Sequence, residues 1–166
     1  MKKLAILVLL ALELAVGGCG NSTSTTSTTT DASGNWEAQM TGGIGEASLL
    51  NFVTAFTVNN SGPLNITGFS FINTGTCFVS GAVESGTATL TTDSTNQVTG
   101  TLTYTVQSGT PAGNTLTLTG NVTGTSSSNA LTGGAVTGTW TLTGGSGCTG
   151  SGNFTMCQNA TTCGTT

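Results

Sequence analysis

Apolar and hydroxyl-bearing residues alternate along most of the chain, with the two-residue period of a half-buried β-strand. In VTGTLTYTV, residues 98–106, one face carries valine, glycine, leucine and tyrosine, and the other carries only threonine. The same alternation returns over 116–124 and 136–142. Threonine suits an outward strand face because its β-branch favours the extended backbone and its hydroxyl can stay hydrated. The pattern therefore predicts strands with an apolar inner face and a threonine outer face.

Clusters of glycine, proline, asparagine and serine interrupt the alternation and predict turns. These clusters occupy 59–63, 93–96, 108–114 and 126–129. They delimit strands that we expect near 34–41, 48–58, 64–72, 86–92, 97–107, 116–124, 136–142 and 150–157. Over 46–56 the apolar residues also fit helical spacing, so a short helix is the alternative there.

About eight or nine short strands joined by tight turns predict an all-β domain with an antiparallel meander. We favour a small closed or nearly closed barrel, because closure removes sheet edges and the domain has no lysine to protect an edge. A β-sandwich is the alternative. Glycines on the apolar strand faces would permit sharp bending or close packing inside a small barrel. They are Gly100, Gly120, Gly124 and Gly138.

The first 19 residues, MKKLAILVLLALELAVGGC, have the composition of a secretory signal. Two lysines precede an apolar run that extends from Leu4 to Val16 and contains Glu13. The run is about 13 residues long, whereas a membrane-spanning helix needs roughly 20. The acidic residue makes spanning less favourable still. We therefore expect an export signal rather than a transmembrane anchor.

The sequence Val16-Gly17-Gly18-Cys19 resembles the lipobox of bacterial lipoproteins. The resemblance implies that a signal peptide, residues 1–18, is removed and that Cys19 is acylated as the mature N-terminus. Several acyl chains on one cysteine would anchor the protein stably. Gly20 and Asn21 follow the cysteine, whereas an aspartate there is the inner-membrane retention signal of this class, so the outer membrane is expected. An ordinary secretory signal that leaves Cys19 as a free thiol is the alternative.

Residues 20–33 form a Ser/Thr-rich tract of low complexity. Such a tract has too few apolar side chains to form a core and predicts a flexible tether. We therefore assign 19–33 to the lipidated cysteine and tether, and 34–166 to one all-β domain. About a fifth of the domain is Leu, Ile, Val or Phe, which is at the lower limit for ordered globular domains.

Charge excludes several functions. The only basic residues are Lys2 and Lys3, both in the signal, and the chain has no histidine. Nucleic-acid binding is not expected, because phosphate neutralisation requires basic side chains. Seryl catalysis lacks a base, and the few carboxylates are scattered along the sequence. We expect a protein that is not an enzyme and that has no cofactor and no metal site.

Five cysteines become four once Cys19 is assigned to lipid: Cys77, Cys148, Cys157 and Cys163. Exported proteins reside in oxidising compartments, so disulfides are expected. Three pairings are possible, and we favour Cys77–Cys148 with Cys157–Cys163. The long bridge would contribute roughly 4 kcal/mol and the short one about 2 in the chain-entropy model.

Gly34-Asn35-Trp36 at the start of the domain resembles the Gly-x-Trp motif on the first strand of lipocalin-like (calycin) barrels. The resemblance implies a cavity for a small apolar ligand, lined by Trp36, Tyr104 and Trp140. These aromatic residues would otherwise fill the core. Two functions are therefore expected: an envelope role in structure or in binding protein or glycan, which we favour, and carriage of a small hydrophobic molecule.

Overall fold

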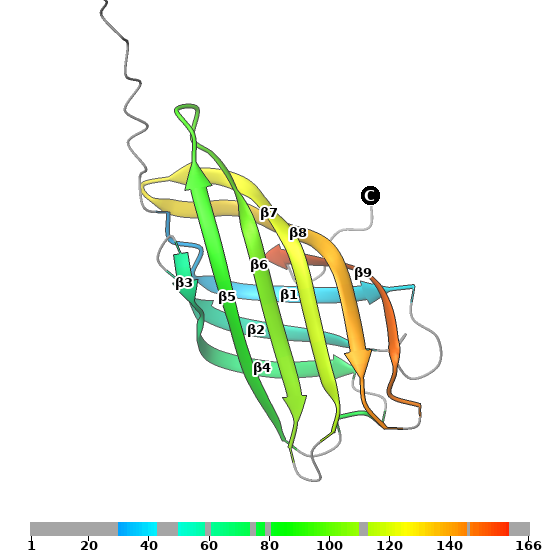
Figure 1. Ribbon diagram of the computed structural model, residues 1–166. Coiled ribbons are helices and arrows are strands. Elements are labelled where there is room, and N and C mark those ends of the chain that lie inside the picture. The colour runs from blue at the N-terminus through cyan, green and yellow to red at the C-terminus, as the bar shows by residue number, and fades with distance from the viewer. Residues whose placement is uncertain are drawn as a thin grey trace, which may run out of the picture.

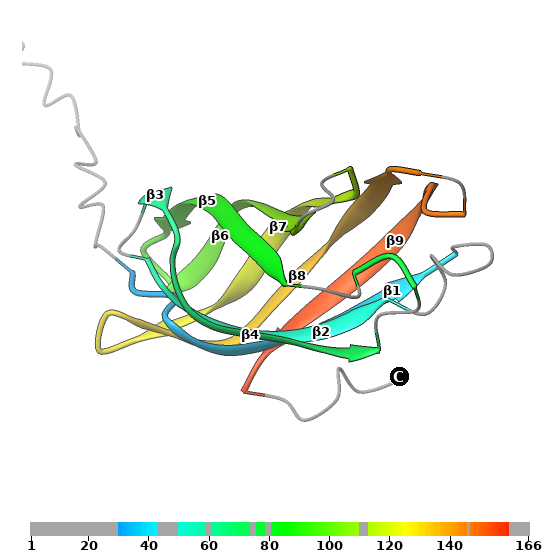
Figure 2. The same cartoon turned by 90° about the horizontal axis from the view of Figure 1, so that it is seen from below.

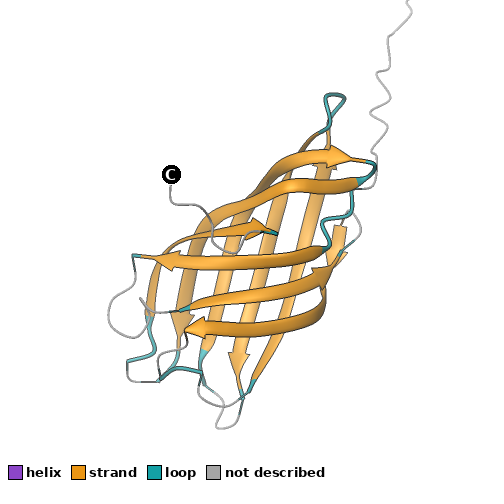
Figure 3. Ribbon diagram, turned by 180° about the vertical axis from the view of Figure 1, so that it is seen from behind, coloured by secondary structure: helices purple, strands orange, loops and turns teal. Residues whose placement is uncertain are grey.

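The computed structural model describes residues 30–42, 50–58, 61–73, 76–78, 81–109, 113–145 and 147–159. All regular structure in these segments is β, and Figure 3 shows the strands in orange. The strands are β1 (Gly34–Thr41), β2 (Asn51–Thr57), β3 (Ser61–Pro63), β4 (Asn65–Asn73), β5 (Ala82–Thr92), β6 (Gln97–Ser108), β7 (Thr115–Ser127), β8 (Ala130–Thr143) and β9 (Gly150–Gln158). In this part of the chain no helix has the length and apolar character needed to cross a bilayer.

The strands form one antiparallel sheet in the order β3-β5-β6-β7-β8-β9-β1-β2-β4. Strands β3 and β4 lie at opposite ends of this order, yet only Leu64 separates them in the sequence. The sheet must therefore curl until its two ends meet, as Figures 1 and 2 show. β3 pairs with β5, whereas β4 pairs with β2 and forms no ladder with β5. The result is a curled half-barrel that is closed only at β3.

The structure confirms the expected all-β meander and corrects two local predictions. Residues 51–57 form strand β2, so the helix considered there is wrong for that segment. The predicted turn at 59–63 is also partly wrong, because Ser61–Pro63 is strand β3. Pro63 is tolerated there because β3 is an edge strand that pairs only with β5, so a missing N–H interrupts no ladder.

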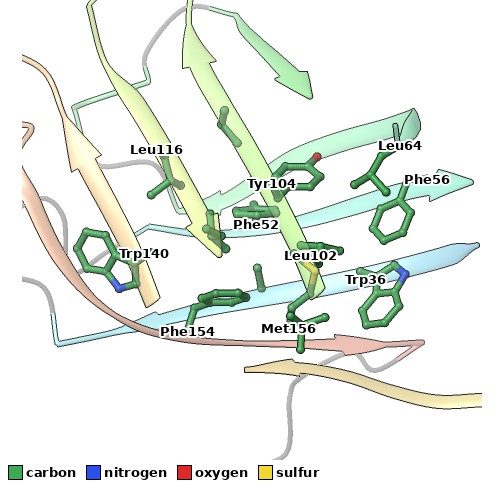
Figure 4. Packing of buried hydrophobic residues seen from close by; sticks show 14 of the residues in the cluster. Trp36, Phe52, Phe56, Leu64, Leu102, Tyr104, Leu116, Trp140, Phe154 and Met156 are labelled. Atoms are coloured by element: carbon green, nitrogen blue, oxygen red, sulfur yellow. The ribbon is translucent and has the colours of Figure 1, made fainter. Parts of the chain in front are cut away.

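The inner face of the sheet holds a continuous apolar core. Alternation along β6 and β7 directs Leu102, Tyr104, Val106, Leu116 and Leu118 inward, and none of them is more than 2% exposed. Figure 4 shows how side chains from several strands fill this space. Glycines on the same face bring the strands close together, as predicted: a Cβ at Gly138 would lie 2.1 Å from the Thr119 carbonyl oxygen.

The packed domain includes at least four residues before the start that its composition suggests. Thr30 and Ala32, which we assigned to the tether, are buried. The backbone N–H of Asp31 donates to the Asn129 carbonyl at 2.7 Å, and the Leu131 N–H donates to the Asp31 carbonyl at 2.8 Å. Residues 30–33 are therefore packed against the β7–β8 hairpin, which corrects the boundary that was placed at residue 34.

The predicted long disulfide is present. Cys77 and Cys148 are bonded, with Cα atoms 5.6 Å apart and a sequence separation of 71. Cys157 is also disulfide-bonded, and Cys163, its expected partner, lies outside the described residues, as does Cys19. The Cys77 bridge fixes the turn at 76–78, where Phe78 packs on Phe71 with ring centroids 5.0 Å apart.

Candidate functional site

The three aromatic residues predicted to line a ligand cavity are core residues. Trp36, Tyr104 and Trp140 are each 2% exposed or less. Trp36 stacks on Phe56 with centroids 5.6 Å apart, and its indole N–H donates to the Ala32 carbonyl. In Figure 4 the two tryptophans lie towards opposite sides of the cluster, with Tyr104 between them. Their arrangement therefore matches the packing alternative more closely than a shared ligand chamber.

Tyr104 belongs to a buried chain of two hydrogen bonds. The Thr54 hydroxyl donates to the Gly68 carbonyl at 3.1 Å, so the Tyr104 hydroxyl donates to Thr54 Oγ1 at 2.7 Å. Burial raises the pKa of Tyr104 well above its usual range, and the charge of Glu84 raises it further. Tyr104 is therefore a hydrogen-bond donor at any physiological pH.

The side of the half-barrel where β4 leaves β5 is its open side, and we call it the seam. The last backbone hydrogen bond between this segment and β5 comes from Leu64, whose N–H donates to the Gly86 carbonyl at 2.9 Å. Beyond that point no ladder joins β4 to the first half of β5. Figure 2 shows the two strands diverging from the corner at β3.

Glu84 lies on the inward face of β5 at the seam. It lies on the same face of the strand as Ala82, Ala88 and Leu90, and its cross-strand partner is Val106. Burial raises the pKa of Glu84, and a hydrogen bond from its own backbone N–H opposes this increase. Sequence reasoning missed this residue, although its position in the apolar phase of the strand was a readable signal.

The outer face of β1, β2 and β4 is hollowed. The hollow has a volume of about 370 Å³ and is open to solvent. Ala55 and Gly68 are cross-strand partners at its floor, and Val53, which is 39% exposed, stands beside them. Asn35 and Ser70 add polar groups at the margin. Of the three predicted ligand residues, only Trp36 contributes atoms to this hollow.

The outward face of β5 to β8 carries rows of hydroxyl and amide side chains. We call this surface the hydroxyl face; it comprises Ser85, Thr87, Thr89, Thr101, Thr103, Thr105, Thr117, Thr119, Asn121, Thr137, Thr139 and Thr141. Register aligns them across the strands: Thr87 opposes Thr103, Thr103 opposes Thr119, and Thr119 opposes Thr139. Neighbouring members of a row are about 5 Å apart, the interstrand spacing. Within the described chain, none of these side chains has a hydrogen-bonding partner in the protein.

The carboxylates of Asp31, Glu37 and Asp93 accept local hydrogen bonds. Asp93 accepts from the backbone N–H groups of Thr95 and Gln97, and the Thr95 hydroxyl is the main cause of its lowered pKa. Asp31 accepts from the Ser33 N–H, and Glu37 accepts from Gln39. Across the same residues, no group of three or more metal-binding side chains is present.

The chain was compared with protein-family models, with curated proteins and with solved structures, and none of the three comparisons finds a match. The functional argument therefore depends on the residues and their geometry.

Proposed function

We propose that this chain is an envelope lipoprotein, held at the outer membrane by an acylated Cys19, whose β domain is a non-catalytic module that binds a neutral glycan. The hydroxyl face carries the proposal. Its side chains are regularly spaced, and their hydrogen-bonding groups are not used by the protein in the described chain.

A neutral glycan fits this face better than a protein partner does. Protein interfaces concentrate their binding energy in buried aromatic, arginine and large apolar side chains. The hydroxyl face has no aromatic or arginine side chain. Of the exposed large apolar residues of the described chain, Val53 and Ile72 lie on β2 and β4, and Val83 lies at the end of the hydroxyl face, next to Ser85 in the outward phase of β5. Threonine hydroxyls both donate and accept hydrogen bonds, which suits the hydroxyl groups of an uncharged sugar.

The anchoring part of the proposal is supported by the lipobox-like sequence and by the charge of the domain. The mature chain would contain no cation, so attraction to anionic lipid cannot hold it at a membrane. Lipid on Cys19 would supply the attachment. Residues 20–29 would then link the lipid to Thr30, the first residue that the structure describes.

Retention on immobilised neutral polysaccharides, namely dextran, mannan and a β-glucan, tests the proposal. The double variant Thr103→Val/Thr119→Val removes two adjacent hydroxyls but keeps the β-branched shape. We expect it to weaken retention severalfold, whereas Thr57→Val, on the exposed side of β2, should leave retention unchanged. Failure to bind any neutral polysaccharide, or equal retention of both variants, would refute glycan binding at this face.

Carriage of a small hydrophobic molecule is the second candidate, and one observation favours it. The aromatic side chains that β4 directs inward, Phe69 and Phe71, are only partly buried, so the seam gives solvent access to apolar surface. A carrier would use this seam rather than the filled space around Trp140.

A further inference from the structure

Burial along the inner face shows where the half-barrel is accessible. Inward side chains of β6 and β7, such as Leu102 and Leu116, are fully packed. The inward side chains at the seam, which belong to β4 and to the first half of β5, are only half-buried. They are Ile66, Phe69, Phe71, Ala82 and Glu84. In the described chain, large apolar side chains of the inner face are therefore accessible to solvent where the ladder between β4 and β5 is missing.

The β4 side of the seam is an aromatic wall. Phe69 and Phe71 meet edge to face with centroids 4.9 Å apart. Behind them, Phe52 lies 5.1 Å from Phe69, and the Tyr104 ring is nearly parallel to Phe69 at 6.5 Å. These contacts fix the ring orientations, so the wall is preformed rather than assembled on binding.

The β5 side of the seam presents one negative charge. Glu84 precedes Gly86, the cross-strand partner of Tyr104, by two residues, so Glu84 and Tyr104 are diagonal neighbours on the same face. In the described chain no other side chain forms a hydrogen bond or ion pair with Glu84. The chain cannot supply a basic partner from its domain, because its two lysines are Lys2 and Lys3. Any cation that pairs with this carboxylate must therefore come from outside the domain.

We propose that the seam binds an organic cation with an apolar body, such as a quaternary or primary amine, whose charged group contacts Glu84 while its body lies on Phe69 and Phe71. A carboxylate beside aromatic rings attracts cations through both charge and the ring quadrupole. This inference specifies the ligand class for the small-molecule candidate and rests on it; it is independent of glycan binding.

An isosteric pair of probes tests the charge directly. Benzyltrimethylammonium and neopentylbenzene have the same shape and differ by one positive charge, and benzylsulfonate supplies the anionic comparison. The protein is the full mature chain with Cys19→Ser, which can be handled without detergent. Binding is followed by nuclear magnetic resonance, from the ring resonances of Tyr104, the single tyrosine, and of the phenylalanines.

We expect the cation to bind about five- to tenfold more tightly than its neutral isostere, the range for a partly exposed ion pair with an aromatic contact. Glu84→Gln should reduce this ratio to the smaller preference that the aromatic rings alone provide, and Glu84→Asp should keep it above that level. Thr103→Val/Thr119→Val should leave it unchanged, which separates the seam from the hydroxyl face. Equal affinity for the isosteres would overturn the role of Glu84 while small-ligand binding stands, and no binding of any probe would overturn both.

Discussion

Gly138 is a position where one added methyl group should clearly destabilise the fold. It lies on the inner face of β8, opposite Gly120 on β7 and Phe154 on β9. An alanine Cβ would lie 2.1 Å from the Thr119 carbonyl oxygen and 2.4 Å from the Gly120 Cα. Both atoms belong to the backbone, so no side-chain rotation can relieve the overlap.

The expected effect of Gly138→Ala follows from these distances. Reaching ordinary contact requires β7 and β8 to separate by about 1 Å at this point, and overpacking of this kind costs about 1–3 kcal/mol. Replacing glycine also lowers the conformational entropy of the unfolded chain, which stabilises the folded state by about 0.4–1 kcal/mol. We therefore expect a net loss of about 1–2 kcal/mol in the free energy of unfolding. Urea denaturation measures it as a lower midpoint with an unchanged slope.

Gly145→Ala is the matched control, because it makes the same chemical change just after the same strand. A Cβ at Gly145 would meet no atom within 4 Å, and its φ angle is not positive. Only the unfolded-state effect remains, so Gly145→Ala should stabilise the protein by up to about 1 kcal/mol. Equal stabilities of the two variants would refute the idea that close backbone approach at Gly138 limits the fold.

Four further predictions concern the disulfide, two carboxylates and the N-terminus. Replacing Cys77 and Cys148 together with alanine should cost roughly 4 kcal/mol of unfolding free energy in urea, because their loop spans 71 residues; a loss below about 1 kcal/mol would contradict this. The raised pKa of Glu84 means that wild-type stability falls as pH rises through the carboxyl range, so Glu84→Gln should have the higher melting temperature at pH 7 and an equal one near pH 3. Asp93 has a lowered pKa, so its charged form stabilises the fold and the effect of pH is reversed. Asp93→Asn should have a lower melting temperature than wild type at pH 7, and the two melting temperatures should converge as pH falls below about 3.8. Mass spectrometry of the mature N-terminus should find acyl chains on Cys19, and a free thiol there would exclude the lipoprotein proposal.

Much of the fold could be predicted from the sequence, because one short-range signal dominates it. Alternation of threonine with apolar residues located β6 and β7 to within a few residues. Strand β3 could not be found this way: Ser61–Pro63 has turn composition, and only its pairing with Thr87–Thr89 makes it a strand. Burial of residues 30–33 likewise depends on the distant β7–β8 hairpin.

The candidate site was less predictable because its access depends on where pairing stops. The sequence singled out Trp36, Tyr104 and Trp140, which are the largest aromatic side chains and for that reason the best core fillers. Glu84 carried a local signal, its inward phase on β5. The divergence of β4 from β5 did not, because it depends on pairing between strands: β4 pairs with β2, whereas β5 pairs with β3.

The seam affects both the stability of this domain and the access of ligands to its inner face. With few large apolar residues, the core is filled partly by bringing strands together at inward glycines, as between Gly138 and Gly120. Close strand approach is not possible along the seam, because β4 and β5 form no ladder there. There the inner face is covered by aromatic side chains, and Phe78 among them is held by the neighbouring Cys77–Cys148 bridge. Loss of this bridge should therefore enlarge the seam as well as destabilise the fold, since the covalent link holds the turn at 76–78, next to the seam, against the connection between β8 and β9.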